Sequence, residues 1–444
     1  MPRRKTCLAA LAALAFGSNV SCGSGGSARS AGGFVPIDPK RPGDTLFGDA
    51  VTRFDAGIAA QTAGFAKRRA GDTAGATASF QAAQTELAAA RGLFDQLLAD
   101  AALCGPAPAS IRCDAAACYG GRSSYELGIG ANELAALTGA ASTALSSFQD
   151  AATRLDAMEL GYPASWMLDQ AAYYDGRARY HLAQKGLDTW ANARAQFQGS
   201  LAANAAGRYA DNAQYYLGRC WYEEGLALVN VPVPPAPGSP GWLAASADFQ
   251  SAETELRKVL SSYPASPYVL NARYYLGKTF YERPYDATVS LAGRVSDLNA
   301  AIGWFDQVIA ANGAFLADAR YWRGRCHYAL AFDLVAAPNP PDVAQLDAAL
   351  LDVKAVQPPS AYADNALYYA AKSYVNLHVA TPTDATGAFC TAARPGDAAP
   401  ASACDAYTAL KTLSTTNASY AGSPYLAKTQ SYIQTTLPSC ICTW

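Results

Sequence analysis

The stretch Tyr-Pro-Ala-Ser-Pro-Tyr-Val-Leu-Asn-Ala-Arg-Tyr-Tyr-Leu-Gly-Lys, residues 263–278, contains the motif that decides the fold. Its last six residues have an aromatic pair, then a glycine, then a basic residue, and this pattern occurs five times, with alanine replacing glycine in the last copy. The copies lie at 172–177, 214–219, 273–278, 320–325 and 367–372, in steps of 42, 59, 47 and 47 residues. Recurrence at such a period predicts an all-α array of helical hairpins.

A second helix is predicted between successive copies, because apolar residues recur there at spacings of four and three. These spacings place each set on one face of a helix. The sets are Ala151, Leu155, Met158; Ala193, Phe197, Leu201; Ala252, Leu256, Val259; Ala301, Phe305, Val308; Leu346, Leu350, Val353; and Ala406, Leu410, Leu413. Prolines such as Pro163 and Pro264 then end one helix before the next motif helix begins. We expect the repeat glycine to lie where two helices cross too closely for a side chain.

The chain divides by pattern into five parts. They are a signal peptide at 1–21, a flexible tether at 22–44, a helical hairpin with a cysteine loop at 45–118, the repeat array at 119–438 and a tail at 439–444. The hairpin is predicted as helices over 46–70 and 73–103, with Asp72 capping the second. The segment 104–118 is predicted as a loop.

The first residues are typical of an export signal. Arg3, Arg4 and Lys5 precede a short apolar run at 8–16, which is too short to span a bilayer. The end of the signal, Asn19-Val20-Ser21-Cys22, resembles a bacterial lipobox, which implies cleavage before Cys22 and lipidation of its sulfur. The alternative is ordinary cleavage after Ser18 or Ser21, which would release a protein without an anchor.

The chain has 11 cysteines, and export exposes thiols to oxidation, so most are predicted to form disulfides. The candidates are Cys104, Cys113, Cys118, Cys390, Cys404, Cys440 and Cys442. We expect Cys390 and Cys404 to close the insertion at 379–403. Cys220 and Cys326 each follow the repeat glycine by two residues and are predicted as buried free thiols.

The repeats resemble the tetratricopeptide signature. Tyr215-Tyr216-Leu217-Gly218 with Trp221, followed by Ala252, Leu256, Val259 and Pro264, matches it almost in full. The run at 263–278 is similar to repeats of Gram-negative envelope proteins, namely the lipoprotein subunit of the outer-membrane barrel-assembly machine and the periplasmic repeat protein of the Tol–Pal system. The resemblance implies a right-handed helical solenoid whose first helices line a concave groove. It also implies a periplasmic scaffold that Cys22 anchors to the outer membrane.

Three residue positions around the repeat glycine share one helix face: a tyrosine three before it, a cation one after it, and a tyrosine four after it. The predicted groove residues are Tyr173, Arg177, Tyr215, Arg219, Tyr222, Tyr274, Lys278, Tyr281, Tyr321, Arg325, Tyr328, Tyr368 and Lys372. Such a surface suits an extended peptide with acidic groups or an anionic glycan. The alternative is that the tyrosines pack repeat against repeat and the cations are solvated.

The rest of the sequence favours binding over catalysis. The net charge of −2 argues against nucleic acid as the main partner. The three histidines lie on different repeats, and no metal, phosphate-loop or paired-carboxylate motif appears, so we expect no enzyme activity and no cofactor. The expected partner is an envelope protein or peptide. The alternative function is carbohydrate binding, which a local aromatic pocket near 226–241 or 379–403 would favour over a continuous cationic groove.

Overall fold

The computed structural model describes residues 42–104, 111–285, 291–334, 340–380, 389–438, 440 and 442. These residues form 16 α-helices and no β-strand, so the predicted all-α class is confirmed. They form two compact units, here called the N-terminal unit (42–223) and the C-terminal unit (224–442), and the boundary falls within one helix, α8. The predicted signal peptide, the tether up to residue 41 and the lipidation site Cys22 lie outside the described residues.

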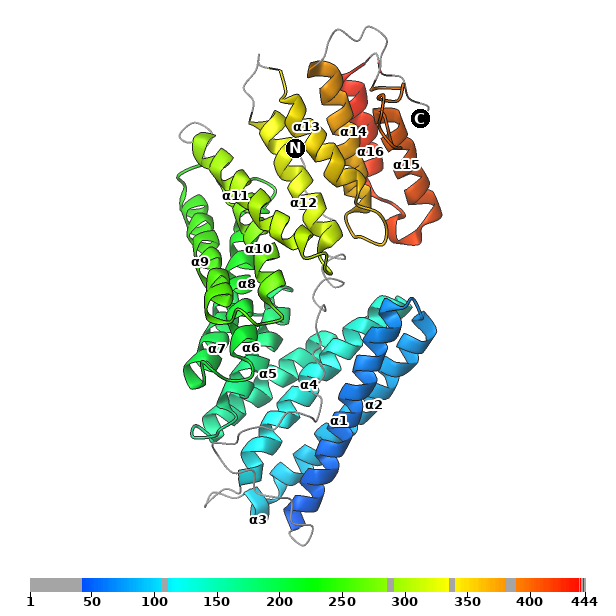
Figure 1. Cartoon of the computed structure of the whole chain (residues 1–444). Coiled ribbons are helices and arrows are strands. Elements are labelled where there is room, and N and C mark those ends of the chain that lie inside the picture. The colour runs from blue at the N-terminus through cyan, green and yellow to red at the C-terminus, as the bar shows by residue number, and fades with distance from the viewer. Residues whose placement is uncertain are drawn as a thin grey trace. The chain divides into compact units, whose positions relative to one another are not determined.

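The N-terminal unit comprises the first seven helices and most of the eighth. They are α1 (Pro42–Arg69), α2 (Thr73–Ala99), α3 (Ala101–Cys104), α4 (Ile111–Thr138), α5 (Ala144–Gly161), α6 (Leu168–Ala183), α7 (Trp190–Ala203) and α8 (Ala210–Val229). Each of α1, α2, α4, α5 and α6 packs against the next in this order, and α6 packs against α7. The long helices α1, α2 and α4, coloured blue to cyan, lie side by side in Figure 1.

The hairpin of α1 and α2 is confirmed, with its turn at Gly71, where φ is +78°. Asp72 caps α2 as predicted, because its carboxylate accepts a 2.8 Å hydrogen bond from the backbone N–H of Gly75. The predicted loop at 104–118 is wrong over 111–118, since α4 begins at Ile111 and contains both Cys113 and Cys118, while residues 105–110 lie outside the described residues. The Ala- and Gly-rich sequence there is helical because its small side chains let α4 pack closely on α2 and α5.

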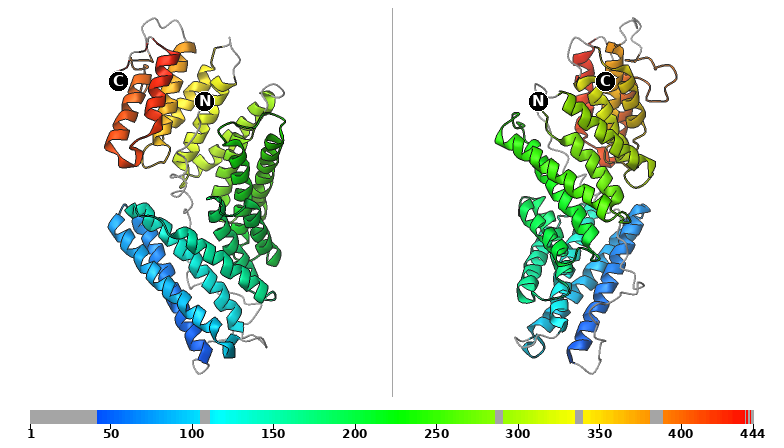
Figure 2. Two further views of the ribbon diagram at one scale, coloured as in Figure 1. Left: turned by 180° about the vertical axis from the view of Figure 1, so that it is seen from behind. Right: turned by 60° about the vertical axis from the view of Figure 1, so that its left-hand side comes forward.

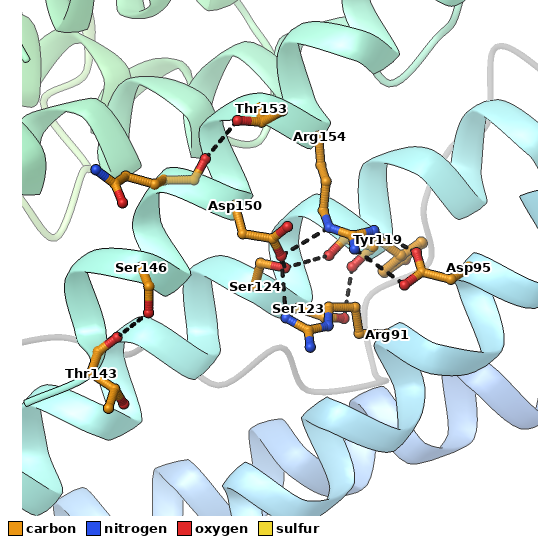
Figure 3. A network of polar contacts seen from close by, with 12 residues as sticks. Arg91, Asp95, Tyr119, Ser123, Ser124, Thr143, Ser146, Asp150, Thr153 and Arg154 are labelled. Atoms are coloured by element: carbon orange, nitrogen blue, oxygen red, sulfur yellow. Dashed lines mark hydrogen bonds and ion pairs between the residues drawn. The ribbon is translucent and has the colours of Figure 1, made fainter.

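A network of charged side chains joins α5 to α2 (Figure 3). The guanidinium of Arg154 on α5 donates hydrogen bonds to Asp95 on α2 at 3.1 Å and to Asp150 at 2.9 Å. Arg91 on α2 donates to the same Asp150 at 3.2 Å. Ser124 of α4 donates to Asp150 as well, so three helices meet at one carboxylate.

The C-terminal unit continues the pairwise pattern to the end of the chain. Its helices are α9 (Pro240–Ser262), α10 (Val269–Glu282), α11 (Leu291–Ala310), α12 (Leu316–Tyr328), α13 (Val343–Lys354), α14 (Ala363–Ala380), α15 (Ala403–Thr416) and α16 (Pro424–Thr436), with a π-turn at Ala329–Asp333 and a 3-10 turn at Ala418–Tyr420. Each helix from α9 to α16 packs against the next, and α16 also packs against α14. Figure 2 shows the yellow to red helices α12 to α16 of this unit from two sides.

The predicted role of the repeat glycine is confirmed in both units. A Cβ on Gly176 of α6 would lie 2.8 Å from the ring of Phe197 on α7, and one on Gly277 of α10 would lie 2.6 Å from the ring of Phe305 on α11. Contact between heavy atoms is normally about 3.5–4.0 Å. The glycine therefore lets a phenylalanine of the paired helix lie directly against the backbone.

Three disulfides join cysteines within the described residues: Cys104–Cys113, Cys390–Cys440 and Cys404–Cys442. The expected Cys390–Cys404 bridge is wrong. The Cys404 N–H does donate to the Cys390 carbonyl at 2.9 Å, so the two backbones are adjacent, but each sulfur bonds to a cysteine of the C-terminal segment. Cys118, a disulfide candidate, lies buried outside the three disulfides, and so do Cys220 and Cys326, for which burial without a disulfide was predicted.

None of the helices in the part of the chain that the structure describes combines the length and the apolar character needed to cross a membrane.

Candidate functional site

The predicted groove residues lie mostly inside the protein. The tyrosines three residues before the repeat glycine are buried in four of the five copies, and so are the cations Arg177, Arg219 and Lys278. The remaining two cations, Arg325 and Lys372, are partly exposed, as are Tyr281 and Tyr368. The tyrosines therefore pack helix against helix, as in the alternative interpretation, but all five cations lie against aromatic rings and three of them are buried, not solvated.

Three of the five cations, Arg177, Lys278 and Arg325, reach a ring of the following motif copy. Arg177 lies 4.1 Å from the ring centroid of Tyr216, and Lys278 lies 5.2 Å from that of Trp322. Arg325 lies 5.2 Å from the ring of Tyr369 in the same way. A cation within about 6 Å of a ring face is attracted by the negative electron density there. The repeated pair of aromatic residue and cation thus stabilises the stacking of one helix pair on the next.

In the N-terminal unit the two buried arginines also have polar partners. Arg177 donates to the Tyr173 hydroxyl at 2.6 Å, and Arg219 forms a 3.0 Å ion pair with Glu223. The Tyr180 hydroxyl donates to the same Glu223 carboxylate at 3.1 Å. Arg219 is therefore paired and Arg177 hydrogen-bonded within the fold, and the burial of both side chains leaves them little access to a ligand.

The C-terminal unit contains a cleft of about 820 Å³, into which the partly exposed members of the motif extend. A cleft of this size is within the range of ligand-binding sites, about 300–1,000 Å³. Its walls come from the end of α10, from α11, α12 and α14, and from the segment that follows α8 (Figure 1). The cleft includes three predicted residues, Tyr281, Arg325 and Lys372.

Cations and tyrosines alternate along one wall of this cleft. Arg294 lies 4.9 Å from the ring of Tyr285 and 5.4 Å from that of Tyr281. Arg325 lies 4.7 Å from the ring centroid of Tyr281 and 5.2 Å from that of Tyr369. Lys372 follows, 5.3 Å from the ring of Tyr369. The order is therefore Tyr285, Arg294, Tyr281, Arg325, Tyr369, Lys372, and we call this row the cation–tyrosine wall.

The opposite lining is the proline-rich segment 229–237 together with Trp242 of α9. Pro232, Pro234, Pro235 and Pro237 all line the cleft. Because each proline ring fixes its own φ, this segment is stiff and holds its side of the cleft in place. The insertion at 226–241, named in the sequence analysis as a place where an aromatic pocket would favour carbohydrate binding, is thus a structural part of the cleft.

The lining is strongly basic. It contains four basic residues and one acidic residue, Glu282. Arg283 is compensated, since it pairs with Asp297 at 3.2 Å and with Glu253. Among the described residues, no carboxylate forms an ion pair with Arg325 or Arg294, and Arg294 donates to the backbone carbonyls of Phe280 at 3.3 Å and Arg283 at 3.5 Å. The cleft therefore presents a positive potential.

Sequence reasoning missed half of the cation–tyrosine wall. Tyr369 is the second aromatic of its motif copy and could have been included, but Arg294 and Tyr285 lie outside the motif, in segments treated as insertions. Trp242 follows a proline-rich stretch and carried no periodic signal. The packing of one helix pair on the next brings these residues together, and a motif repeated along one helix face does not encode that packing.

Two carboxyl groups and one histidine outside the cleft lining have a strongly shifted pKa. Burial raises the pKa of Asp318 to about 6, although the Ser360 hydroxyl and the charge of Lys278 act against the shift. Burial also raises the pKa of Glu159 to about 7, helped by the nearby Asp156. Burial lowers the pKa of His181 to about 3, so this imidazole is neutral at physiological pH. His181 stacks on Phe148 at 4.5 Å and serves core packing.

The sulfur atoms of Cys390, Cys404 and Cys440 lie within 4.8 Å of one another, a spacing compatible with a metal site. The two disulfides explain this grouping, because each of these sulfurs is bonded to another sulfur. A disulfide sulfur is not a thiolate and does not serve as a ligand. The group is therefore a pair of adjacent cross-links.

Comparison of the chain with models of protein families and with curated proteins finds no match to either.

Proposed function

We propose that the chain is a non-catalytic scaffold that binds a protein or an extended peptide through the cleft of its C-terminal unit. The observation that carries this proposal is the cation–tyrosine wall, which gives a ligand-sized cleft a positive lining. Arginine offers planar paired N–H donors to carboxylates, and tyrosine adds a flat apolar surface with one polar tip.

A tetratricopeptide-type solenoid is the architecture that we infer for the array. Supporting it are the sequential pairing of helices, the glycine that admits a phenylalanine of the paired helix, and the prolines that end α5 and α9. In such arrays each repeat contacts only its neighbours, and loops between helices are tolerated. The segment 229–237 would then be an insertion that shapes the binding surface.

We further propose that the scaffold acts in the periplasm of a Gram-negative bacterium, anchored to the outer membrane by a lipid on Cys22 and serving envelope assembly. The basic and apolar start of the sequence and the lipobox-like segment support export. The three disulfides support an oxidising compartment.

Affinity capture from native membranes tests the scaffold function. The wild-type chain is compared with Arg325→Gln and with a matched control, Arg257→Gln. Arg257 also lies over an aromatic ring, that of Trp304 at 5.2 Å, but it is on the exposed face of α9 and does not line the cleft. We expect a defined protein partner that is lost in Arg325→Gln and retained in Arg257→Gln. Equal capture by all three chains would contradict binding through the cleft.

Carbohydrate binding is the second candidate, and one observation favours it: the cleft lies beside the 226–241 insertion and contains Trp242 and Tyr285. Tyr285 is the more exposed of the cleft tyrosines, at 36%. A sugar would stack on these rings through its apolar face. Binding of neutral oligosaccharides that is unaffected by salt and lost in Trp242→Ala would support this alternative over the scaffold.

A further inference from the structure

We propose that the cleft is selective for acidic peptide segments, and that Arg325 is the main anchor for their carboxylates. This inference rests on the proposed function and specifies the chemistry of the partner. It follows from the charges of the lining, from the unpartnered polar atoms there and from the way the ring faces are covered.

The first argument is the electrostatic position of Arg325. Its guanidinium lies against the rings of Tyr281, Trp322 and Tyr369 at 4.7, 4.8 and 5.2 Å. Against the effect of burial, the negative charge of Glu282 helps to raise the pKa of Arg325, but no carboxylate among the described residues is in direct contact with the guanidinium. Cation–ring contacts compensate only part of the cost of withdrawing a charge from water. A carboxylate arriving in the cleft would supply the missing counter-charge in a partly desolvated place, where hydrogen bonds between charged groups are strong.

The second argument concerns hydrogen-bonding groups. Within the described lining, three side-chain atoms are buried without a partner: Nε1 of Trp242, Nε of Arg283 and Nε of Arg325. All three are N–H donors, and no buried side-chain acceptor of the described lining is left without a partner. A lining with surplus donors favours a ligand rich in acceptors. Carboxylates and peptide carbonyls satisfy this requirement, whereas a basic or donor-rich ligand does not.

The third argument separates a charged peptide from a sugar. The faces of Tyr281 and Tyr369 are already covered by Arg294, Arg325 and Lys372, so these rings are poorly available for stacking. What the wall presents is a row of cationic groups held apart by the rings between them. Several carboxylates along an extended chain match such a row better than one compact anion, in which the charges are concentrated at a point.

The test uses the purified full-length chain and fluorescent peptides of ten residues. One probe alternates glutamate with glycine and serine, its control replaces every glutamate by glutamine, and both are amidated at the C-terminus. A third probe is the glutamine peptide with a free C-terminal carboxylate. Fluorescence anisotropy at low and physiological salt reports the dissociation constants. We expect the glutamate peptide to bind at least tenfold more tightly than the glutamine control, since each hydrogen bond to a charged group contributes about a factor of ten or more.

Variants then localise the binding. We expect Arg325→Gln and Lys372→Gln each to weaken binding of the glutamate peptide by about tenfold, and Arg257→Gln to leave it unchanged. Far-UV circular dichroism and melting curves identify a variant that has lost its fold. The comparison of the two peptides on the wild-type chain does not depend on any variant, so it decides the question even if Arg325→Gln unfolds.

Three results would overturn the inference: equal binding of the glutamate and glutamine peptides, tight binding that requires only the free C-terminus, or displacement by an oligogalacturonate but not by unlabelled glutamate peptide. Failure of the inference is distinguishable from failure of the proposed function. A chain that captures a protein partner in an Arg325-dependent way but ignores acidic peptides remains a scaffold of different specificity.

Discussion

Replacing Gly277 by alanine tests whether the helix pairs depend on the absence of a side chain at the repeat glycine. On propensity alone the change should stabilise α10, because alanine in a helix interior is favoured over glycine by about 1 kcal/mol. The structure opposes this gain. The new methyl would lie 2.6 Å from Cε1 and 2.7 Å from Cζ of Phe305, whose ring is fully buried.

The ring must therefore move by about 1 Å to restore ordinary contact distances. Neighbouring core residues such as Leu298 and Val308 are themselves fully buried, so the ring has no open space to enter. Overpacking of this kind costs about 1–3 kcal/mol. After the propensity gain is subtracted, we expect Gly277→Ala to lower the unfolding free energy by up to about 2 kcal/mol.

Gly303→Ala is the matched control. Gly303 lies on the paired helix α11, but a Cβ there has no atom within 4 Å, so we expect stabilisation by up to about 1 kcal/mol. Because the chain has two units, hydrogen exchange of peptides from α10 and α11 is the suitable assay, with urea unfolding in support. The double variant Gly277→Ala/Phe305→Leu should recover part of the loss. A Gly277→Ala chain as stable as Gly303→Ala would refute the reasoning.

Three further predictions concern other parts of the fold. The pKa of Asp318 is about 6 in the folded state and near its ordinary value of 3.8 in the unfolded state, so the folded state holds this proton more tightly. As the pH rises through this range, the unfolding free energy of the wild type should therefore fall relative to that of Asp318→Asn, by about 3 kcal/mol in all. Urea unfolding from pH 4 to 8 measures the difference between the two chains, and a difference that does not change with pH would contradict the prediction. The double variant Cys404→Ser/Cys442→Ser should lower the stability of the C-terminal unit by about 2–4 kcal/mol, and peptide mapping of the non-reduced wild type should find no Cys390–Cys404 link. Arg154→Met keeps an unbranched apolar stem but removes the charged bridge between α5 and α2, and we expect a loss of about 1 kcal/mol, because the carboxylates that Arg154 joins are partly exposed. A loss in thermal melting above the range for surface ion pairs would contradict this expectation.

The helix pairs were predictable because their signals are local. The 3.6-residue spacing of apolar residues and the prolines after α5 and α9 act within one helix or one turn, and the repeat glycine acts only on the helix that follows next in the sequence. The fifth copy follows the same logic. Ala371 replaces the glycine there, and the apolar set of α15 has Leu410 in the place that Phe305 occupies in α11.

The failures concern features that depend on tertiary packing. Spacing placed Arg177, Arg219 and Lys278 on one helix face, but whether that face meets solvent or the next repeat depends on how helix pairs stack. The Cys390–Cys404 bridge was inferred from nearness in the sequence, whereas the C-terminal segment brings two more cysteines to the same place. The cleft needs residues from α9, α11 and a proline-rich segment, which share no motif.

Site-specific photo-crosslinking in cells of the native organism tests the central claim most directly, namely that the cleft holds a protein partner. A crosslinking residue replaces Tyr285, which is 36% exposed and lines the cleft, or Leu351 as a control, which is 74% exposed and does not line it. We predict a defined protein adduct at position 285 that disappears when Arg325→Gln is added, and no such adduct at position 351. The same adduct at both positions, or none at 285 that depends on Arg325, would contradict the account.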